Sequence, residues 1–187
     1  MRSSPAYWDF AANQYEAGRS TFTPNAGSCW CAHGSDVVGT SDLGDQSGKT
    51  VLEVGCGHGA TLEALAVAFP SGRFQGLDFS DVQVRLARKR TRHLPNVSFT
   101  LGDARLGLPA ELGAFDEVLS IYGAFDFSNN PALMMDAFLR RLKAGGACTV
   151  LTSVREVFDA VVHESSLEIS RTLELGTRWF VRATLSR

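Results

Sequence analysis

Residues 50–60 combine an acid with three glycines at a spacing that suits nucleotide binding. They read TVLEVGCGHGA, in which a β-branched run contains Glu53 and is followed by Gly55, Gly57 and Gly59. A strand, a glycine-rich turn and a helix in this order bring backbone amides close to a bound nucleotide. Glycine is needed there because a side chain would block the approach and because tight turns often require positive φ. We therefore predict a nucleotide site directly after the first strand.

Two more acids stand at the ends of the next two predicted strands. GLDFS places Asp78 at the end of the second strand, and LGDA places Asp103 at the end of the third. A carboxylate at Asp78 can accept both hydroxyls of a ribose, and one at Asp103 can accept a hydrogen bond from an adenine amino group. Each acid alone has a structural alternative, since either could cap the helix or turn that follows. Together, beside the glycine turn, they indicate a nucleoside site.

The elements that must position these residues alternate along the chain. The hydrophobic patterns predict strands at 51–54, 73–77, 97–101, 115–122 and 147–153, and helices at 5–17, 61–69, 80–92 and 131–142. The last of these helices is expected to bury Leu133 and to end at Gly145-Gly146. Strands that alternate with helices imply a parallel α/β sheet. Apolar alternation from 167 to 185, with a turn at Gly176-Thr177, predicts an antiparallel hairpin at its edge.

Composition and length narrow the class of protein. The chain has 187 residues, 44% hydrophobic and 20% charged, with a net charge of −2, which suits a single domain and does not favour nucleic acid or an anionic membrane as partner. No apolar run approaches the roughly 20 residues of a membrane span, and the N-terminus lacks a signal-peptide core, so we expect a cytoplasmic protein. The basic run from Arg85 to Arg92 is interpreted as a solvated helix face rather than an RNA contact.

A metal site is not predicted. Cys29, Cys31 and His33 lie on one side of an extended segment, but structural zinc usually needs four ligands and no second ligand cluster follows. Cys56 lies in the glycine turn and Cys148 in a buried strand.

Residues 50–153 resemble a class I S-adenosylmethionine-dependent methyltransferase. VLEVGCGHG is similar to the first motif of that family, LKAGGACTVL to the stretch that leads into its fifth strand, and the final hairpin to its reversed seventh strand. The resemblance implies a Rossmann-like, mostly parallel seven-stranded sheet with an antiparallel C-terminal hairpin. It divides one methyltransferase domain into an N-terminal lid segment at 1–49, a cofactor-binding core at 50–153 and a C-terminal helix and hairpin at 154–187.

The same resemblance assigns roles to individual residues. Glu53 would reach the methionine amine of S-adenosylmethionine, Asp78 the ribose hydroxyls and Asp103 the adenine amine, with Ala104 offering a backbone amide. WDFAANQYE resembles a lid helix, which places Tyr15 near the cofactor. The full predicted cofactor set is Tyr15, Glu53, Gly55, Cys56, Gly57, Gly59, Asp78, Phe79, Asp103, Ala104 and Ser120.

Methyl transfer requires that the acceptor atom, the methyl group and the leaving sulfur are aligned in a desolvated pocket. Some acceptors also require a base. Tyr122 and Phe125, which follow the fourth strand, and Trp30 from the N-terminal segment are the predicted substrate contacts. Core packing is the alternative for Phe125. His58 and His163 are the candidate catalytic bases, and a structural role is the alternative for each.

Two classes of function remain open at this level. The first is S-adenosylmethionine-dependent methyl transfer to a small molecule, with S-adenosylhomocysteine as product, because SIYGAF stands where many amino-methylating nucleic-acid enzymes carry Asn-Pro-Pro-Tyr. The second is a cofactor-binding protein of the same fold without transferase activity, because no base is evident and only 154–165 precede the hairpin. A nicotinamide oxidoreductase is a third alternative, because the residues from Gly55 to Ala60 fit a relaxed G-x-G-x-x-A pattern. Asp103 would have no role in a nicotinamide site, which counts against this alternative. The exposed hairpin edge could also support a homodimer.

Overall fold

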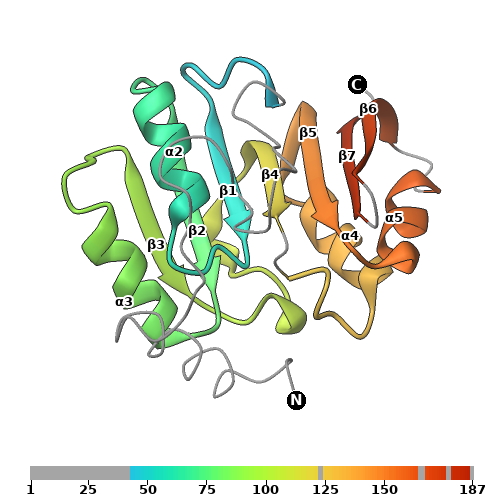
Figure 1. The fold of residues 1–187 in the computed structure, drawn as a ribbon, viewed down its shortest axis with the longest axis horizontal. Helices are drawn as coiled ribbons and strands as arrows, with labels where there is room; N and C mark the ends of the chain where they lie inside the picture. Colours follow the sequence, from blue (N-terminus) through green and yellow to red (C-terminus); the bar gives the residue numbers. More distant parts are fainter. Residues whose placement is uncertain (1–42, 122–123, 164–166, 176–177, 186–187) are drawn as a thin grey trace.

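The computed structural model describes residues 43–121, 124–163, 167–175 and 178–185, and they build one twisted sheet with helices on both faces (Figure 1). The strands lie in the order β3-β2-β1-β4-β5-β7-β6. Their bounds are Thr50–Val54 for β1, Arg73–Asp78 for β2, Val97–Leu101 for β3, Phe115–Ile121 for β4, Leu142–Thr152 for β5, Leu167–Leu175 for β6 and Arg178–Leu185 for β7.

The direction of the strands confirms the predicted fold class. β1 to β5 are parallel, whereas β7 pairs antiparallel with both β5 and β6. The hairpin is therefore inserted so that its second strand touches the parallel sheet and its first strand, β6, forms the edge. Because β1 pairs with β2 on one side and β4 on the other, the loop after β1 lies where the strand order reverses. In open α/β sheets this position is where ligands bind.

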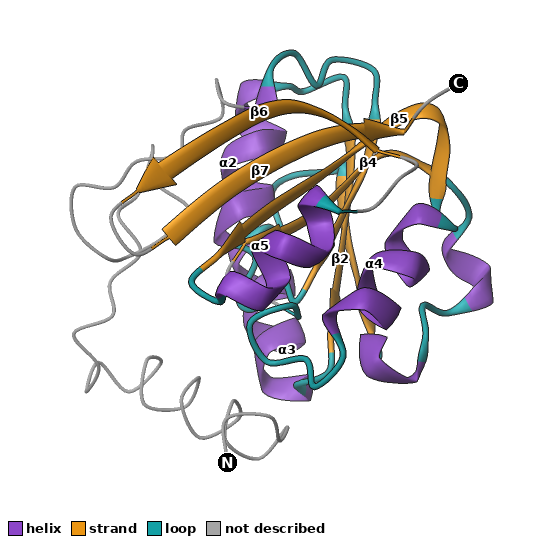
Figure 2. Cartoon of the chain, turned by 90° about the vertical axis from the view of Figure 1, so that its right-hand side faces the viewer, coloured by secondary structure: helices purple, strands orange, loops and turns teal. Residues whose placement is uncertain are grey.

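Two pairs of helices cover the two faces (Figure 2). α2, Ala60–Ala68, and α3, Asp81–Arg90, pack on one face. α4, Pro131–Leu139, and α5, Arg155–Val162, pack on the other. Neighbouring residues of β1 alternate between the two cores: Val51 belongs to the core under α2 and α3, and Leu52 to the core under α4 and α5. Both side chains are fully buried, as expected for a central strand.

Two predicted helix starts are confirmed by their caps. The Ser80 hydroxyl accepts a hydrogen bond from the Gln83 amide at 3.2 Å, and Asn130 Oδ1 accepts one from the Leu133 amide at 3.1 Å. Pro131 then occupies the first position of α4. These contacts satisfy amides that the first helical turn leaves without a partner.

The predicted end of the fourth helix is wrong. α4 ends at Leu139, Leu133 is 56% exposed, and Leu142 already belongs to β5, where it pairs with Phe115. The register between β4 and β5 shifts after this pair, and Gly145, with a φ of 72°, lies inside the irregular stretch. The glycine pair thus permits a bulge in a long strand instead of terminating a helix.

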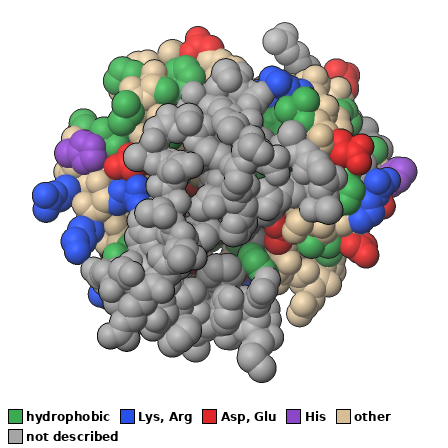
Figure 3. Space-filling view, in the orientation of Figure 1, with side chains coloured by type: hydrophobic (Ala, Val, Ile, Leu, Met, Phe, Trp, Pro, Cys, Tyr) green, Lys and Arg blue, Asp and Glu red, His purple; other side chains and the backbone are tan. Residues whose placement is uncertain are grey.

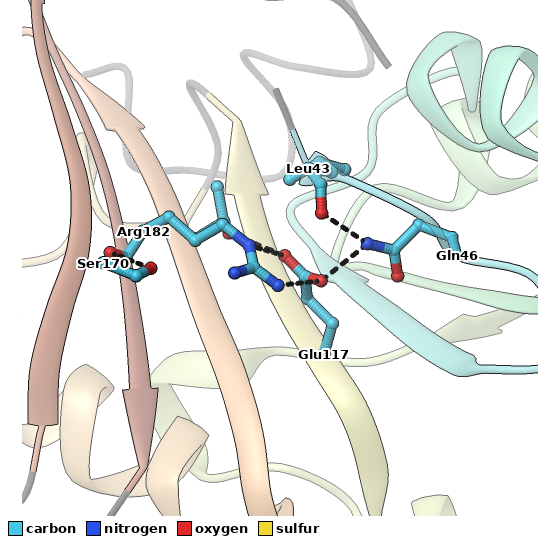
Figure 4. Close-up of polar contacts among 6 residues, drawn as sticks. Leu43, Gln46, Glu117, Ser170 and Arg182 are labelled. Carbon is cyan, nitrogen blue, oxygen red and sulfur yellow. Dashed lines mark hydrogen bonds and ion pairs between the residues drawn. The ribbon is translucent and has the colours of Figure 1, made fainter. Parts of the chain in front are cut away.

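A buried polar cluster joins β4, β5 and β7 (Figure 4). Glu117 of β4 is fully buried and accepts hydrogen bonds from Gln46 Nε2 at 2.8 Å, Thr149 Oγ1 at 2.7 Å and Arg182 Nη2 at 3.1 Å. Gln46 also donates to the Leu43 carbonyl at 2.8 Å, so the segment before β1 is fixed to the sheet. Buried charge is tolerated here because the carboxylate is paired and fully hydrogen-bonded.

The surface of the described residues has two plain features. Lys and Arg side chains gather at the side of the molecule that α2 and α3 form (Figure 3). Several of them are paired: Arg85 with Asp81 at 3.0 Å, and Arg90 with Glu63 at 2.8 Å. Among the described residues, the structure contains no helix with the length and apolarity to cross a bilayer.

Candidate cofactor site

The glycine turn after β1 has the backbone geometry that its sequence predicts. Gly55, Gly57 and Gly59 have φ values of 78°, 52° and 78°, which disfavour any residue with a side chain. The Gly55 amide donates to the Leu77 carbonyl at 2.8 Å, so the turn is bonded to the end of β2. The turn therefore lies across the carboxyl ends of the two strands.

Asp78 fixes this turn from the neighbouring strand. Its Oδ2 accepts a hydrogen bond from the Gly57 amide at 2.8 Å, and its Oδ1 accepts one from the Ser80 amide at 2.9 Å. The side chain is only 7% exposed. The structural alternative raised for Asp78 is thus present, and the same carboxylate is placed beside the glycine turn, where a ribose would lie.

Gly59 is required by packing as well as by its backbone angle. A Cβ at this position would lie 2.9 Å from Phe99 Cζ and 3.1 Å from the Ala87 Cβ. These side chains belong to β3 and α3, so the glycine lets the start of α2 approach both. Gly57 differs, since a Cβ there would meet its nearest atom, Gln83 Oε1, only at 3.8 Å.

Cys56 contributes to the turn through its backbone, and its side chain packs beneath it. The Cys56 amide donates to the Leu77 carbonyl at 3.1 Å. A Cβ on Gly76 would lie 2.6 Å from Cys56 Sγ, which shows how closely the thiol packs on β2. Burial and the nearby carboxylates of Asp78 and Glu53 raise the pKa of this thiol, so it is an inert core group.

Glu53 holds the most unusual group of the site. Its side chain is 2% exposed, and its Oε2 atom is buried without a hydrogen-bond partner among the described residues. Burial raises the pKa of Glu53 to about 8, with a hydrogen bond from Thr61 acting in the opposite direction and the Asp78 charge adding to the rise. A buried acceptor with no donor is costly, and a cationic donor such as an amine would satisfy it.

Ser120 presents a second such group. Its Oγ atom, at the carboxyl end of β4, is buried and has no hydrogen-bond partner among the residues that the structure describes. β4 is the neighbour of β1, with Leu119 opposite Glu53. The two orphaned oxygens therefore belong to adjacent strands at the edge where the glycine turn lies. Because Leu119, the residue opposite Glu53, belongs to the core under α2 and α3, Ser120 points to the other face of the sheet, and the two oxygens do not form one pair.

Asp103 and Phe79 are linked through an arginine that sequence reasoning missed. Asp103 caps the short helix η2, Ala104–Leu106, by accepting a hydrogen bond from the Arg105 amide at 3.0 Å. It also pairs with Arg105 Nη2 at 2.6 Å, and these bonds lower the pKa of the carboxyl. The Arg105 guanidinium lies 5.0 Å from the centre of the Phe79 ring. An acid followed at i+2 by an arginine was the available signal.

A cavity of about 690 Å³ opens beside this group. It lies between the η2 loop, including Ala104 and Leu106, and α4, including Leu133 and Met134. Leu106 is 88% exposed. Of the predicted cofactor residues, Ala104 lines this cavity, whereas the glycine turn, Glu53 and Asp78 do not.

The two candidate bases lie in different surroundings. Burial and the Arg90 charge lower the pKa of His58 to about 4, so its imidazole is neutral at physiological pH and is a weak proton acceptor. His163 is exposed and follows the last residue of α5. That helix begins after β5 and is eight residues long, so His163 is separated from the strand ends by about 12 Å of helix.

The predicted substrate contacts are not brought together by the described residues. Phe125 is 1% exposed and packs edge to face on Phe138, with ring centres 4.9 Å apart. This placement matches the core-packing alternative. Tyr15, Trp30 and Tyr122 lie outside the described residues. No spacing in the sequence singles out Asp126, the neighbour of Phe125, among the aromatic residues that follow the fourth strand.

The cysteines that suggested a metal site are also outside the described part of the chain. Cys29, Cys31 and His33 precede residue 43. Within the described ranges, no three His, Cys, Asp or Glu side chains are grouped as they would be around a metal ion.

The sheet order and the glycine turn agree with the fold of the class I S-adenosylmethionine-dependent methyltransferases. The profile of the family described as "Methyltransferase domain" matches residues 51–146, and the chain belongs to this family. The order of the sheet, with its antiparallel β7, also differs from that of the dinucleotide-binding fold, which disfavours the nicotinamide alternative.

Named relatives and solved structures agree with this class. The chain is 35% identical over 100 residues to the phthiotriol/phenolphthiotriol dimycocerosates methyltransferase of Mycobacterium leprae. The aligned stretch covers 54% of this chain and 36% of that protein. A Mycobacterium ulcerans protein of the same name, numbered 1, is 31% identical over 132 residues, or 71% of this chain and 47% of the relative. The chain thus spans less than half the length of these curated relatives.

The structural likeness concerns the fold. The N-methyltransferase NodS from Bradyrhizobium japonicum WM9, solved with S-adenosyl-L-homocysteine, superposes with a TM-score of 0.63 at 16% identity, covering 74% of this chain and 78% of NodS. A methyltransferase from Aquifex aeolicus described as SAM-dependent superposes with a TM-score of 0.65 at 20% identity, covering 77% and 86%.

Proposed function

We propose that this protein transfers a methyl group from S-adenosylmethionine to a small-molecule acceptor. The observation that carries the proposal is the buried Glu53 carboxyl group, whose Oε2 has no hydrogen-bond partner among the described residues, next to a glycine turn of positive φ. Bound S-adenosylmethionine would supply an electrophilic methyl group on a sulfonium. The chain supplies the acceptor for its amine at Glu53, for its ribose at Asp78 and for its adenine at Asp103.

The acceptor class follows from the named relatives rather than from the pocket. Both are named for phthiotriol and phenolphthiotriol dimycocerosates, and a triol is a hydroxyl-bearing molecule. We therefore propose a hydroxyl-bearing small molecule as the acceptor. Trp30 and Tyr122 remain the proposed acceptor contacts, and Tyr15 remains a proposed cofactor contact.

A cofactor-binding protein without transferase activity is the second candidate. It is favoured by the lowered pKa of His58 and by the distance of His163 from the strand ends, which leave neither predicted histidine suited to accept a proton. S-adenosylhomocysteine release with hydroxyl-bearing acceptors distinguishes the two. Turnover that is lost in Asp78→Ala and kept in Asp81→Ala supports the transferase. Binding of S-adenosylmethionine without any turnover supports the second candidate. Asp81 is exposed on α3 and serves as the matched acid.

The predicted homodimer would use β6. This strand pairs only with β7 among the described strands, and Ile169 on it is 39% exposed. An uncovered edge strand offers backbone groups to a second chain. Light scattering on the wild type and Ile169→Lys tests the proposal: a dimer that the lysine dissociates supports it, and a monomeric wild type contradicts it.

A further inference from the structure

Asp126 occupies a position in the fold where acceptor chemistry is expected. It lies in the loop that follows β4, and β4 is the direct neighbour of β1 and its glycine turn. Asp126 Oδ1 accepts a hydrogen bond from the hydroxyl of Thr152, the last residue of β5. The carboxylate is thus held between the carboxyl ends of two adjacent strands, at the edge of the sheet where ligands bind.

The contact between these two residues is itself supported. Thr152 is fully buried, and its Oγ1 accepts a hydrogen bond from the Val154 amide at 3.0 Å. The hydroxyl is therefore oriented by the chain that enters α5, and its hydrogen is directed to the carboxylate. The amide of Ser153 also donates to Asp126. A carboxylate held by two such donors is fixed in one place.

The surroundings of Asp126 favour its protonated form. Burial raises its pKa above the ordinary aspartate value, although the bonds from Thr152 and Ser153 oppose the rise. Its neighbour Phe125 is buried in the core, as is Val157 of α5.

Cations on the adjacent helices are paired with other acids. On α5, Arg155 pairs with Asp159 at 2.9 Å, and Glu156 is exposed. On α4, Arg140 pairs with Asp136 at 2.9 Å. No cation is paired with Asp126 among the described residues. A carboxylate without a cationic partner, in a largely apolar environment, is a better base than one at the surface.

We propose that Asp126 accepts the proton of a hydroxyl acceptor during methyl transfer. This rests on the proposed function. The acceptor oxygen forms a bond to the methyl carbon, the carbon–sulfur bond breaks with its electron pair remaining on sulfur, and the hydroxyl proton moves to the Asp126 carboxylate. Neutral S-adenosylhomocysteine and the methyl ether are released, and the proton then passes to solvent. The charge and the atoms balance without a further reactant.

The competing explanation is that Asp126 only joins the β4 loop to the start of α5. Asp126→Asn separates the two, because the amide oxygen can still accept from Thr152 while the basic oxygen is lost. Thr152→Val removes the donor but keeps the carboxylate, and Thr152→Ser restores the donor. A structural role predicts that Asp126→Asn, which keeps the hydrogen bond, retains stability and activity, whereas Thr152→Val loses both and Thr152→Ser retains them.

The first readout needs no cofactor. The infrared difference between wild type and Asp126→Asn, followed over pH, reports the titration of this carboxyl directly. We expect a pKa above the ordinary aspartate value, and a higher one in Thr152→Val because the charged form loses its donor. Titration at or below the ordinary value would overturn the proposal.

The second readout is transfer of a labelled methyl group to decanediol, a long-chain phenol and catechol. Asp126→Asn should lower kcat by about a hundred- to ten-thousandfold, the usual contribution of a general base, with S-adenosylmethionine affinity and Tm unchanged. The acid limb of kcat/KM should follow the infrared pKa and move to higher pH in Thr152→Val. Asp81→Asn is the control.

The outcomes distinguish a failure of the proposed function from a failure of the Asp126 assignment. Wild type that does not bind S-adenosylmethionine contradicts the proposed function, and this inference fails with it. Binding without transfer to any of the three hydroxyl probes supports the cofactor-binding candidate without transferase activity, and the assignment of Asp126 then fails with the proposed transferase. Transfer by the wild type together with an Asp126→Asn variant that keeps a third or more of the wild-type kcat overturns the assignment of Asp126 alone.

Discussion

Replacing Glu53 with glutamine should stabilise the protein without cofactor and weaken cofactor binding. The carboxylate is 2% exposed, and burial raises its pKa from an ordinary value of 4.5 to about 8. The folded state then holds one more proton than the unfolded state between these two pH values. The contribution of protonated Glu53 to the free energy of unfolding is therefore fully present below pH 4.5. It decreases as pH rises above 4.5 and is lost once pH passes through about 8.

The size of the effect follows from the pKa difference. Each pH unit in this window lowers the free energy of unfolding by about 1.4 kcal/mol, so the loss approaches about 5 kcal/mol above pH 8. Glutamine does not ionise, so Glu53→Gln should gain stability over the wild type as pH rises from 5 to 8, in the order of several kcal/mol. Urea denaturation at a series of pH values measures the difference. Glu111→Gln replaces an exposed acid in the short helix η3, Ala110–Leu112, and should change stability by less than about 0.5 kcal/mol.

Cofactor binding should respond in the opposite sense. An ammonium group that pairs with Glu53 favours the ionised form, so binding releases a proton and affinity for S-adenosylmethionine rises with pH toward 8. Loss of this charged hydrogen bond in Glu53→Gln should cost about 1.5–3 kcal/mol, or roughly ten- to a hundredfold in Kd. Calorimetry in buffers of different ionisation enthalpy detects the proton. A stability difference that does not vary with pH, together with unchanged affinity, would refute the reasoning.

Other parts of the structure give three further predictions. Gly59→Ala should cost at least about 2 kcal/mol more than Gly48→Ala in urea denaturation, because both have positive φ but only Gly59 has atoms within 3 Å of the new Cβ; equal costs would contradict the packing argument. Arg182→Met should cost about 3–5 kcal/mol by leaving Glu117 buried without its cation, and Glu117→Gln in the same chain should recover much of it in a double-mutant cycle. The wild type should lose about 3 kcal/mol of stability as pH falls from 6.5 to 4, because His58 binds a proton in the unfolded state but not in the folded state, where its pKa is about 4. His58→Asn should not show this pH-dependent loss in acid denaturation.

The sheet could be read from the sequence because its signals are local. Alternation of strands and helices predicts a parallel sheet, and β1, β2 and β3 begin and end within a residue of their predicted bounds. The carboxyl ends of parallel strands share one edge, so the order of elements alone placed Asp78 and Asp103 at the edge of the sheet where the glycine turn lies, and Asp78 contacts the turn. The turn itself needed no tertiary information, because three glycines between a strand and a helix leave few alternatives.

The errors arose where a local signal has two meanings. A glycine pair ends a helix or permits a bulge, and only the pairing of Leu142 with Phe115 decides that Gly145 lies in a strand. Leu133 fits the apolar period of the helix, yet it faces the cavity beside η2 and not the core.

The remaining features depend on contacts that are distant in sequence. Glu117 and Arg182 are 65 residues apart and meet only because β7 inserts beside β5. The lowered pKa of His58, which lies in the glycine turn, comes from burial and from Arg90 of α3. Asp126 is held in place by a hydrogen bond from Thr152, and no spacing in the sequence indicates that these two residues are in contact. Chemistry that rests on burial or on strand order therefore required the structure.

The central claim is that the edge formed by β1, β2 and β4 binds S-adenosylmethionine, and calorimetric titration tests it most directly. S-adenosylmethionine and S-adenosylhomocysteine should bind wild type and Asp81→Ala with Kd values in the micromolar range. Asp78→Ala, which removes the acceptor of the Gly57 amide as well as the proposed ribose contact, should weaken binding of both by tenfold or more. A folded wild type that binds neither compound would contradict the account.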